Sequence, residues 1–346
     1  MVDQPEARRV NTRAIARGGG IAIAAGFVSA SLAMIGLNFG LGLSFVDETQ
    51  GVGAGQIVAL LGGAVLAVGL GLLDDYMQLR ARWQFLGQGV LAAVAVALGV
   101  TVTAVNLPFV ASGTQHLDGL IAAAATVLWI VCMINSTNFI DGLDGLSTGI
   151  ALIAAVTLGT ISLGVGTGRD EPFVALLCFV LAGALAGFLR WNFYPARIFS
   201  GTSGVMLVGY VLAVLSILGA GKIAVALLVL GVPILDTVWI TIRRAASGRS
   251  PFAPDRGHIH HRLLDMGLSH RNTVLVIYGV CIVLACLSLA LSGTGQTYAF
   301  LGLIVVFGLA LFLIEFAGGG AEEIEESLDA SSYGNGPDDE TGRGAP

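Results

Sequence analysis

Long apolar runs, separated by short polar segments, occupy most of the chain. Each run approaches or exceeds the roughly 20 residues that an α-helix needs to cross the ~30 Å hydrocarbon core of a bilayer. The pattern therefore predicts an all-α, polytopic membrane protein with about ten transmembrane helices. The expected spans are residues 19–43, 54–73, 86–105, 118–135, 145–165, 172–189, 203–220, 222–242, 273–292 and 297–316.

Composition supports this fold class and excludes an ordinary soluble enzyme. Hydrophobic residues make up 55% of the chain and charged residues 12%, and the mean hydropathy is +0.85. Soluble domains carry about 25% charged residues. The 49 glycines suit packed membrane helices, because small residues allow two backbones to approach. The four cysteines lie in apolar runs without a CxxC spacing, so a disulfide or zinc framework is not expected.

Basic residues are distributed unevenly between the two sets of loops. If the sides alternate from the N terminus, the set that includes both termini holds fifteen of the 17 basic residues. Basic loops stay in the cytoplasm, so both termini are expected there. We expect a cytoplasmic N-terminal loop at 1–18 and a ten-span transmembrane domain at 19–316. The segment 317–346 reads as a disordered acidic tail, and it accounts for the net charge of −6.

Carboxylates occur at or within predicted spans. Asp74 and Asp75 are adjacent at the inner end of the second span, where a cation or hydrogen-bond donors must offset their repulsion. A solvated helix end is the plainer alternative. Asp236 lies inside the eighth span, about two turns before Arg243 and Arg244. A functional role is the default for such a group, although a structural ion pair is nearly as plausible.

A second polar cluster ends the fourth predicted span. Its amides and carboxylates recur every third residue, at Asn135, Asn138, Asp141 and Asp144. Each step of three rotates by about −60° on an ideal helix, so the first and last would face opposite sides. They converge only if the helix ends or unwinds, as Gly142 and Gly145 permit. The cluster therefore indicates a ligand or metal site rather than capping alone.

Two further cytoplasmic segments carry polar side chains. The segment 190–204 contains Asn192, Phe199 and a glycine-rich turn before a helix, which can bind phosphate, although many such stretches are only connections. The segment 255–262 contains His258, His260 and His261 among arginines. Zinc would need further ligands, so this cluster more plausibly binds phosphates and sugar hydroxyls.

These groups together indicate a reaction class. Carboxylates suit Mg²⁺, basic groups suit phosphate, and an aromatic side chain suits a nucleobase. Because they gather on the cytoplasmic side of an integral membrane protein, we expect a nucleotide-linked substrate and a lipid acceptor. The sequence thus predicts phosphoryl transfer to or from a lipid carrier.

The motifs resemble those of the polyprenyl-phosphate N-acetylhexosamine-1-phosphate transferases, which include MraY-type and WecA/TagO-type enzymes. The resemblance runs from about residue 8 to residue 292, and the His258–His261 loop looks like the WecA/TagO branch. It implies that undecaprenyl phosphate attacks the β-phosphorus of a UDP-N-acetylhexosamine and releases UMP. It also implies Mg²⁺, or alternatively Mn²⁺, as cofactor, a bacterial plasma membrane location and an active-site cleft facing the cytoplasm.

The resemblance further implies roles for individual residues. The catalytic set would be Asp74, Asp75 and Asp144. The metal ligands would be Asp75, Asp141 and Asp144. The substrate-binding residues would be Asn138, Asp141, Asn192, Phe199, His258, His260 and His261.

The chain also departs from the family pattern. Thr202 stands where the family has a metal-binding aspartate, and neutral residues replace a third acid, a lysine and a histidine at Gln78, Gln84 and Asn11. The family's first span is absent as well. Asp144 or Asp236 could substitute in a shifted metal site. Otherwise the chain would bind its substrates without turnover.

Several alternatives follow. N-acetylglucosamine is the favoured sugar, and an MraY-like transfer of phospho-N-acetylmuramoyl-pentapeptide is the runner-up. A second class of function is a catalytically inactive paralogue that only binds, and a third class is a transporter. The transporter is disfavoured because the carboxylates gather at one face instead of lining a midplane path. The expected partners are the UDP-sugar, undecaprenyl phosphate, membrane lipid and, from the family, a second copy in a homodimer. No nucleic-acid partner is expected.

Overall fold

A computed structural model describes residues 2–3, 15–40, 42, 51–106, 114–165, 170–219, 222–246, 248, 257–291 and 293–312. The predicted acidic tail and the departure at Asn11 lie outside these residues. The chain divides into two units, Met1–Leu301 and Gly302–Pro346. The first unit contains the four polar clusters and is described below.

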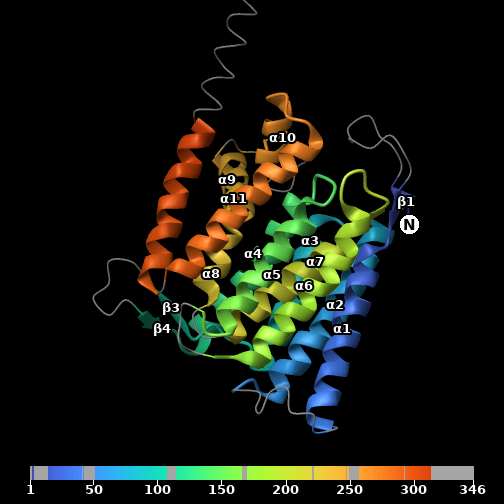
Figure 1. Ribbon diagram of the computed structural model, residues 1–346, viewed down its shortest axis with the longest axis vertical. Helices are drawn as coiled ribbons and strands as arrows, with labels where there is room; N and C mark the ends of the chain where they lie inside the picture. Colours follow the sequence, from blue (N-terminus) through green and yellow to red (C-terminus); the bar gives the residue numbers. More distant parts are fainter. Residues whose placement is uncertain are drawn as a thin grey trace, which may run out of the picture. The chain divides into compact units, whose positions relative to one another are not determined.

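Helices dominate the described residues, so the predicted all-α membrane class is confirmed (Figure 1). They are α1 (Gly19–Ile35) with the π-helix η1 (Gly36–Gly40), α2 (Ala54–Met77), α3 (Ala81–Ala97), α4 (Gly119–Ile140), α5 (Leu146–Ser162), α6 (Pro172–Asn192), α7 (Gly201–Leu218), α8 (Lys222–Val229), α9 (Gly231–Ala246), α10 (Ile259–Asp265) and α11 (His270–Ala290). A further helix covers Thr294–Phe312.

The number of membrane-length helices is lower than predicted. Within the described residues, seven helices are long and apolar enough to cross a bilayer, or eight if α8 and α9 count as one bent span. Helix α5 is apolar but shorter than 18 residues. Helix α3 has 17 residues. All ten predicted runs nevertheless fall on helices, although the count of ten spans is not confirmed.

Two local signals explain where the helices differ from the apolar runs. Predicted span 222–242 is one run, but α8 and α9 meet at an angle of 77°. Pro233 has no N–H to donate and its ring would collide with the carbonyl of Val229, so α8 cannot continue. Similarly, α3 ends at Ala97 because Gly99 adopts a left-handed φ of 91° that stops a helix.

Helix α7 forms the centre of the first unit. It is buried along most of its length and packs against α1, α2 and α4, while α5 packs against α6 and α11. Glycines let α2 approach α7 closely, because a Cβ on Gly71 would overlap the backbone of Ser203. This contact brings the C-terminal end of α2 beside the N terminus of α7.

Two small sheets lie at opposite ends of these helices (Figure 1). Strand β2 (Ile15–Arg17) pairs antiparallel with β1 (Val2–Asp3) and parallel with β5 (Ile198–Phe199), with Arg17 opposite Phe199. At the other end, β3 (Ala104–Asn106) pairs antiparallel with β4 (Thr114–His116). The first sheet ties the N-terminal segment to the chain just before α7.

Candidate active site

The carboxylate of Asp75 lies at the N terminus of α7. Its Oδ1 accepts a hydrogen bond of 2.9 Å from the backbone N–H of Thr202, and its Oδ2 accepts one of 3.1 Å from that of Ser203. Gly201 starts the helix with a φ of 68°, and a Cβ there would lie 2.7 Å from Asp75 Oδ2. A negative charge is favourable at a helix N terminus. Asp75 and the unusual Thr202 are thus direct neighbours.

Asp74 has different partners from Asp75. Its Oδ1 accepts hydrogen bonds from Gln84 Nε2 (2.7 Å) and from the backbone N–H of Leu79 (3.0 Å), and its side chain is buried. These bonds close the turn between α2 and α3. Gln84, one of the departures noted in the sequence, therefore donates to this carboxylate.

Asp141 follows the last residue of α4 and lies between two serine hydroxyls. Ser147 donates to its Oδ1, and Ser200 donates to its Oδ2 over 2.7 Å. Burial raises the pKa of Asp141 to about 6, against the lowering effects of the two serines and Arg17. Asp144 adds a further upward contribution because it is a nearby negative charge. Asp141 joins the ends of α4, α5 and α7.

Asp144 lies in the turn between α4 and α5, and this turn is closed by Gly145 at a φ of 78°. Its Oδ2 accepts a hydrogen bond of 2.9 Å from the backbone N–H of Ala196. Its own N–H donates to His270 Nε2 at 2.9 Å, and the His270 ring stacks on Tyr194. The helix does end at the predicted glycine-containing turn, as the spacing of the polar residues required.

Asn192 and Phe199 flank the segment that leads into α7. Asn192 is buried, accepts a hydrogen bond from Thr148 Oγ1 (2.8 Å) and donates to the carbonyl of Ile198 (3.0 Å). Phe199 lies in β5, and its carbonyl accepts from the N–H of Gly18. These bonds hold the segment in place, so Asn192 acts at least as a structural tie.

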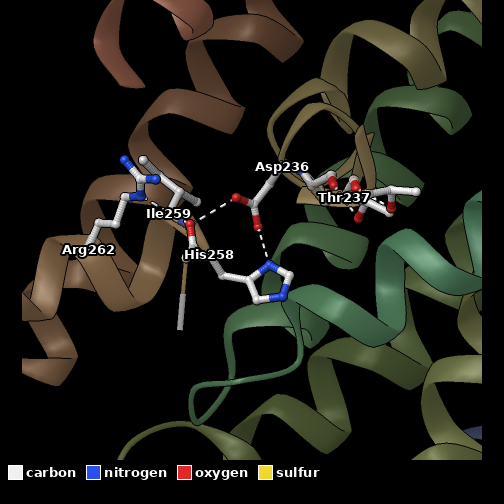
Figure 2. Close-up of polar contacts among 8 residues, drawn as sticks. Asp236, Thr237, His258, Ile259 and Arg262 are labelled. Carbon is white, nitrogen blue, oxygen red and sulfur yellow. Dashed lines mark hydrogen bonds and ion pairs between the residues drawn. The ribbon is translucent and has the colours of Figure 1, made fainter. Parts of the chain in front are cut away.

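His258 forms an ion-pair-like contact with a carboxylate inside the membrane domain. Its Nδ1 lies 2.7 Å from Asp236 Oδ2, and Asp236 Oδ1 accepts a hydrogen bond of 2.9 Å from the N–H of Ile259 (Figure 2). Ile259 is the first residue of α10. The buried carboxylate on α9 therefore anchors the start of the histidine-bearing helix.

His260 is 1% exposed, and neither of its ring nitrogens has a hydrogen-bond partner within the described part of the chain. Its ring lies between those of His258 and His261, with centroids at 5.5 Å and 4.3 Å. A Cβ on Gly142 would overlap its Nε2, so α10 contacts the turn after Asp141. Burial and the neighbouring histidines lower the pKa of His260 well below its usual range.

The remaining predicted residues lie nearby in the chain. Asn138 is half-buried in the last turn of α4, and its carbonyl accepts from the N–H of Asp141. Asn135, one turn earlier, is buried and donates to Gln88 Oε1 on α3 at 2.6 Å. Among the residues that the structure describes, no group of three or more His, Cys, Asp and Glu side chains is arranged to hold a metal ion.

The structure adds side chains that the sequence analysis did not select. The serine hydroxyls of Ser147 and Ser200 bind Asp141, and His270 binds the turn at Asp144. Serines are common in loops and give no distinctive signal. His270 lies just before the predicted span 273–292 and was not among the histidines selected for the site.

These geometries join four separated segments at one end of the helices. The hydrogen bonds link α2 to α7 and α9 to α10. They also link the α4–α5 turn to Ala196 after α6, to Ser200 before α7 and to His270 at the start of α11. The predicted cleft is not itself described, but the residues expected around it are brought together.

Comparison with known proteins gives consistent matches. A sequence model of glycosyl transferase family 4 matches residues 57–220. The chain is 37% identical to the probable undecaprenyl-phosphate N-acetylglucosaminyl 1-phosphate transferase of Bacillus subtilis (strain 168), over 90% of this chain and 82% of that protein. It is also 37% identical to the decaprenyl-phosphate N-acetylglucosaminephosphotransferase of Mycolicibacterium smegmatis, over 94% and 84% of the two chains.

A third relative is named for the transfer of a different group. The phospho-N-acetylmuramoyl-pentapeptide-transferase of Desulforudis audaxviator is 34% identical over 71% of this chain and 78% of that protein. This match covers less of the chain than the N-acetylglucosamine transferases above do.

Proposed function

Because the chain belongs to glycosyl transferase family 4, among the polyprenyl-phosphate N-acetylhexosamine-1-phosphate transferases, we propose that it transfers N-acetylglucosamine 1-phosphate from UDP-N-acetylglucosamine to a polyprenyl phosphate. The family resemblance drawn from the sequence motifs is confirmed. The observation that carries the proposal is the convergence of Asp75, Asp141, Asp144 and the α10 histidines at one end of the helices.

The proposed reaction exchanges one phosphoanhydride bond for another. A phosphate oxygen of the lipid attacks the β-phosphorus of the UDP-sugar, and the bond from that phosphorus to the bridging oxygen breaks. UMP leaves with the bridging oxygen, and the lipid keeps the sugar phosphate as a diphosphate. Both reactants are anionic, so the barrier contains a large electrostatic component.

The chain's own residues can act on that barrier by positioning and by hydrogen bonding. We assign Asp75, whose carboxylate is held by the first N–H groups of α7, to the lipid-phosphate side of the site, where it would accept the proton of the attacking phosphate. The α10 histidines, beside Gly142, are assigned to the sugar diphosphate. The buried, unpartnered ring nitrogens of His260 favour this role, since a substrate oxygen would satisfy them.

Mg²⁺ dependence is part of the proposal. Mg²⁺ binds through one or two carboxylates, keeps several waters and would neutralise the diphosphate charge. Asp141 offers such a donor set, because its carboxylate lies against two hydroxyl oxygens and close enough to Asp144 for the two charges to repel. We therefore assign the metal side of the site to Asp141 and Asp144, with Thr202 as a neutral neighbour of Asp75.

The test is UMP release by the detergent-purified protein with undecaprenyl phosphate and UDP-N-acetylglucosamine, in Mg²⁺, in Mn²⁺ and in EDTA. We expect metal-dependent UMP release that falls at least about 100-fold in Asp75→Asn, because an amide cannot accept the proton of the lipid phosphate. Thr237→Val, which loses only a hydrogen bond within α9, is the matched control and should retain activity.

Other outcomes separate the alternatives. UMP release only with UDP-N-acetylmuramoyl-pentapeptide would favour the reaction named for the third relative. Binding of UDP-sugars without UMP release, but with activity restored in Thr202→Asp, would identify a degenerate enzyme. If neither the wild-type protein nor Thr202→Asp releases UMP with any of these donors, the transferase proposal is contradicted.

A further inference from the structure

Asp236 is a buried carboxylate to which the proposed reaction assigns no role. It lies on α9, just after the break that separates this helix from α8, and it is 1% exposed. Burying an ionised carboxylate is costly unless hydrogen-bond donors compensate its charge. Packing alone therefore does not explain why a carboxylate occupies this buried position.

Both oxygens of Asp236 face the start of α10 (Figure 2). Oδ1 accepts from the backbone N–H of Ile259 at 2.9 Å, and Oδ2 lies 2.7 Å from His258 Nδ1. An ionised carboxylate can only accept hydrogen bonds, so the proton between Asp236 Oδ2 and His258 Nδ1 is carried by Nδ1. The other ring nitrogen of His258, Nε2, is then the one that can exchange a proton or a hydrogen bond with a ligand.

The ring of His258 is fixed toward the residues of the candidate site. It lies nearly parallel to the His260 ring, at 13° and 5.5 Å between centroids, and 5.8 Å from the ring of Phe139. Phe139 belongs to the last turn of α4, between Asn138 and the turn at Asp141. In Figure 2 the second ring nitrogen points away from Asp236.

We infer that Asp236 is a positioning residue for the transfer reaction. It holds His258 in the tautomer protonated at Nδ1, leaves Nε2 for a phosphate oxygen of the substrate, and sets the start of α10 and hence the place of His260. A carboxylate behind a histidine fixes its tautomer and stabilises the imidazolium when Nε2 takes a proton. This inference rests on the proposed function.

The tautomer can be measured without turnover. Solid-state ¹⁵N NMR of histidine-labelled protein in bilayers distinguishes a protonated Nδ1 from a protonated Nε2, and the His258 signal is identified by its loss in His258→Gln. We expect a protonated Nδ1 in the wild-type protein. The preference should be lost in Asp236→Asn, whose amide can also donate to Nδ1, and retained in Thr237→Val, the matched variant on α9.

Kinetics then test whether the contact serves the reaction. We expect Asp236→Asn to lower kcat for UMP release by about ten- to a hundredfold, as is common when the partner of a functional histidine is removed. The KM for the UDP-sugar should change less. In a His258→Gln background, the same substitution should have little further effect, because the group that it positions is already absent.

Three results would overturn the inference. The first is a wild-type His258 that is protonated at Nε2, which contradicts the inference even if Asp236→Asn fails to fold. The second is an equal loss of activity from Asp236→Asn in the wild-type and His258→Gln backgrounds, because this would show a purely structural role. The third is an Asp236→Asn protein that is folded and fully active. A wild-type protein that shows the Nδ1 tautomer but releases no UMP would instead contradict the proposed function.

Discussion

Asp141 is held in a setting that favours its protonated form. Burial raises the pKa of this carboxyl from 3.8 to about 6, and the hydroxyls of Ser147 and Ser200 only partly offset that effect. Below about pH 3 the group is mostly protonated in the folded and unfolded states alike. As the pH rises to 6, the unfolded state loses its proton first, so ionisation in the folded state costs stability.

We therefore expect Asp141→Asn to be more stable than the wild-type protein at pH 7.5 and inactive. The difference should be near zero below about pH 3, grow until about pH 6 and then level off. It should reach about 2 kcal/mol, since each pKa unit corresponds to about 1.4 kcal/mol and partial exposure screens some of this. Thermal unfolding in detergent with EDTA measures it. A constant difference at all pH values would contradict the prediction.

Gly142 leaves space for the ring of His260. A Cβ there would overlap His260 Nε2, whereas a Cβ on Gly89 would meet no atom within 4 Å. We expect Gly142→Ala to displace the imidazole and lower kcat/KM for UMP release at least about tenfold, because small misplacements of a reacting group are costly. Gly89→Ala should keep the wild-type rate. Wild-type kinetics in Gly142→Ala would show that this contact is dispensable.

The contact between α2 and α7 aligns two parts of the candidate site. Its closeness depends on Gly71, whose missing side chain admits the backbone of Ser203. The same approach allows the carboxylate of Asp75, one turn later, to accept from the first N–H groups of α7. Packing between these two helices and the geometry at Asp75 are therefore coupled.

Gly71→Ala should separate the two helices and destabilise the protein. We expect a loss of about 3 kcal/mol, at the upper end for an overpacked core, together with reduced UMP release. Gly69→Ala is the control on the same helix, because its Cβ would meet no atom within 4 Å. Thermal unfolding of both variants in detergent makes the comparison. Equal stabilities would show that α2 and α7 can shift at no cost.

The orientation of the molecule in the bilayer follows from its charge distribution. Fifteen of 17 basic residues lie in the loops that we assign to the cytoplasm. We expect Arg80, before α3, to lie on that side and Thr103, next to β3, to lie on the other. Both side chains are exposed in the first unit.

Cysteine labelling tests this orientation. In a protein whose four native cysteines are replaced by alanine, a membrane-impermeant maleimide should label Thr103→Cys in intact cells. It should label Arg80→Cys only after the membrane is permeabilised. The reverse pattern would place the candidate site outside the cytoplasm, and so away from its proposed nucleotide substrate.

Much of the candidate site could be predicted, because polar residues are rare in a chain that must be apolar to cross a membrane. Asp75, Asp141 and Asp144 stand out against such a background, and all three lie among the hydrogen bonds at one end of the helices. Ser147 and Ser200 could not be selected, since hydroxyls are tolerated anywhere in packed helices. The count of ten spans is not confirmed, because α3 and α5 have only 17 residues each and α8 and α9 meet at a bend.

The sequence by itself determined the membrane class, the family and the candidate residues for the chemistry, because the bilayer imposes long apolar runs and a charged group within them is costly. Only the tertiary structure decided which partners these groups have. Asp74 and Asp75 are adjacent in the chain yet bind different elements, and Asp236 reaches His258 from another helix. The physical reason is that each hydrogen bond joins segments that meet only when the helices pack, and helix packing depends on shape at glycines and prolines that hydropathy does not record.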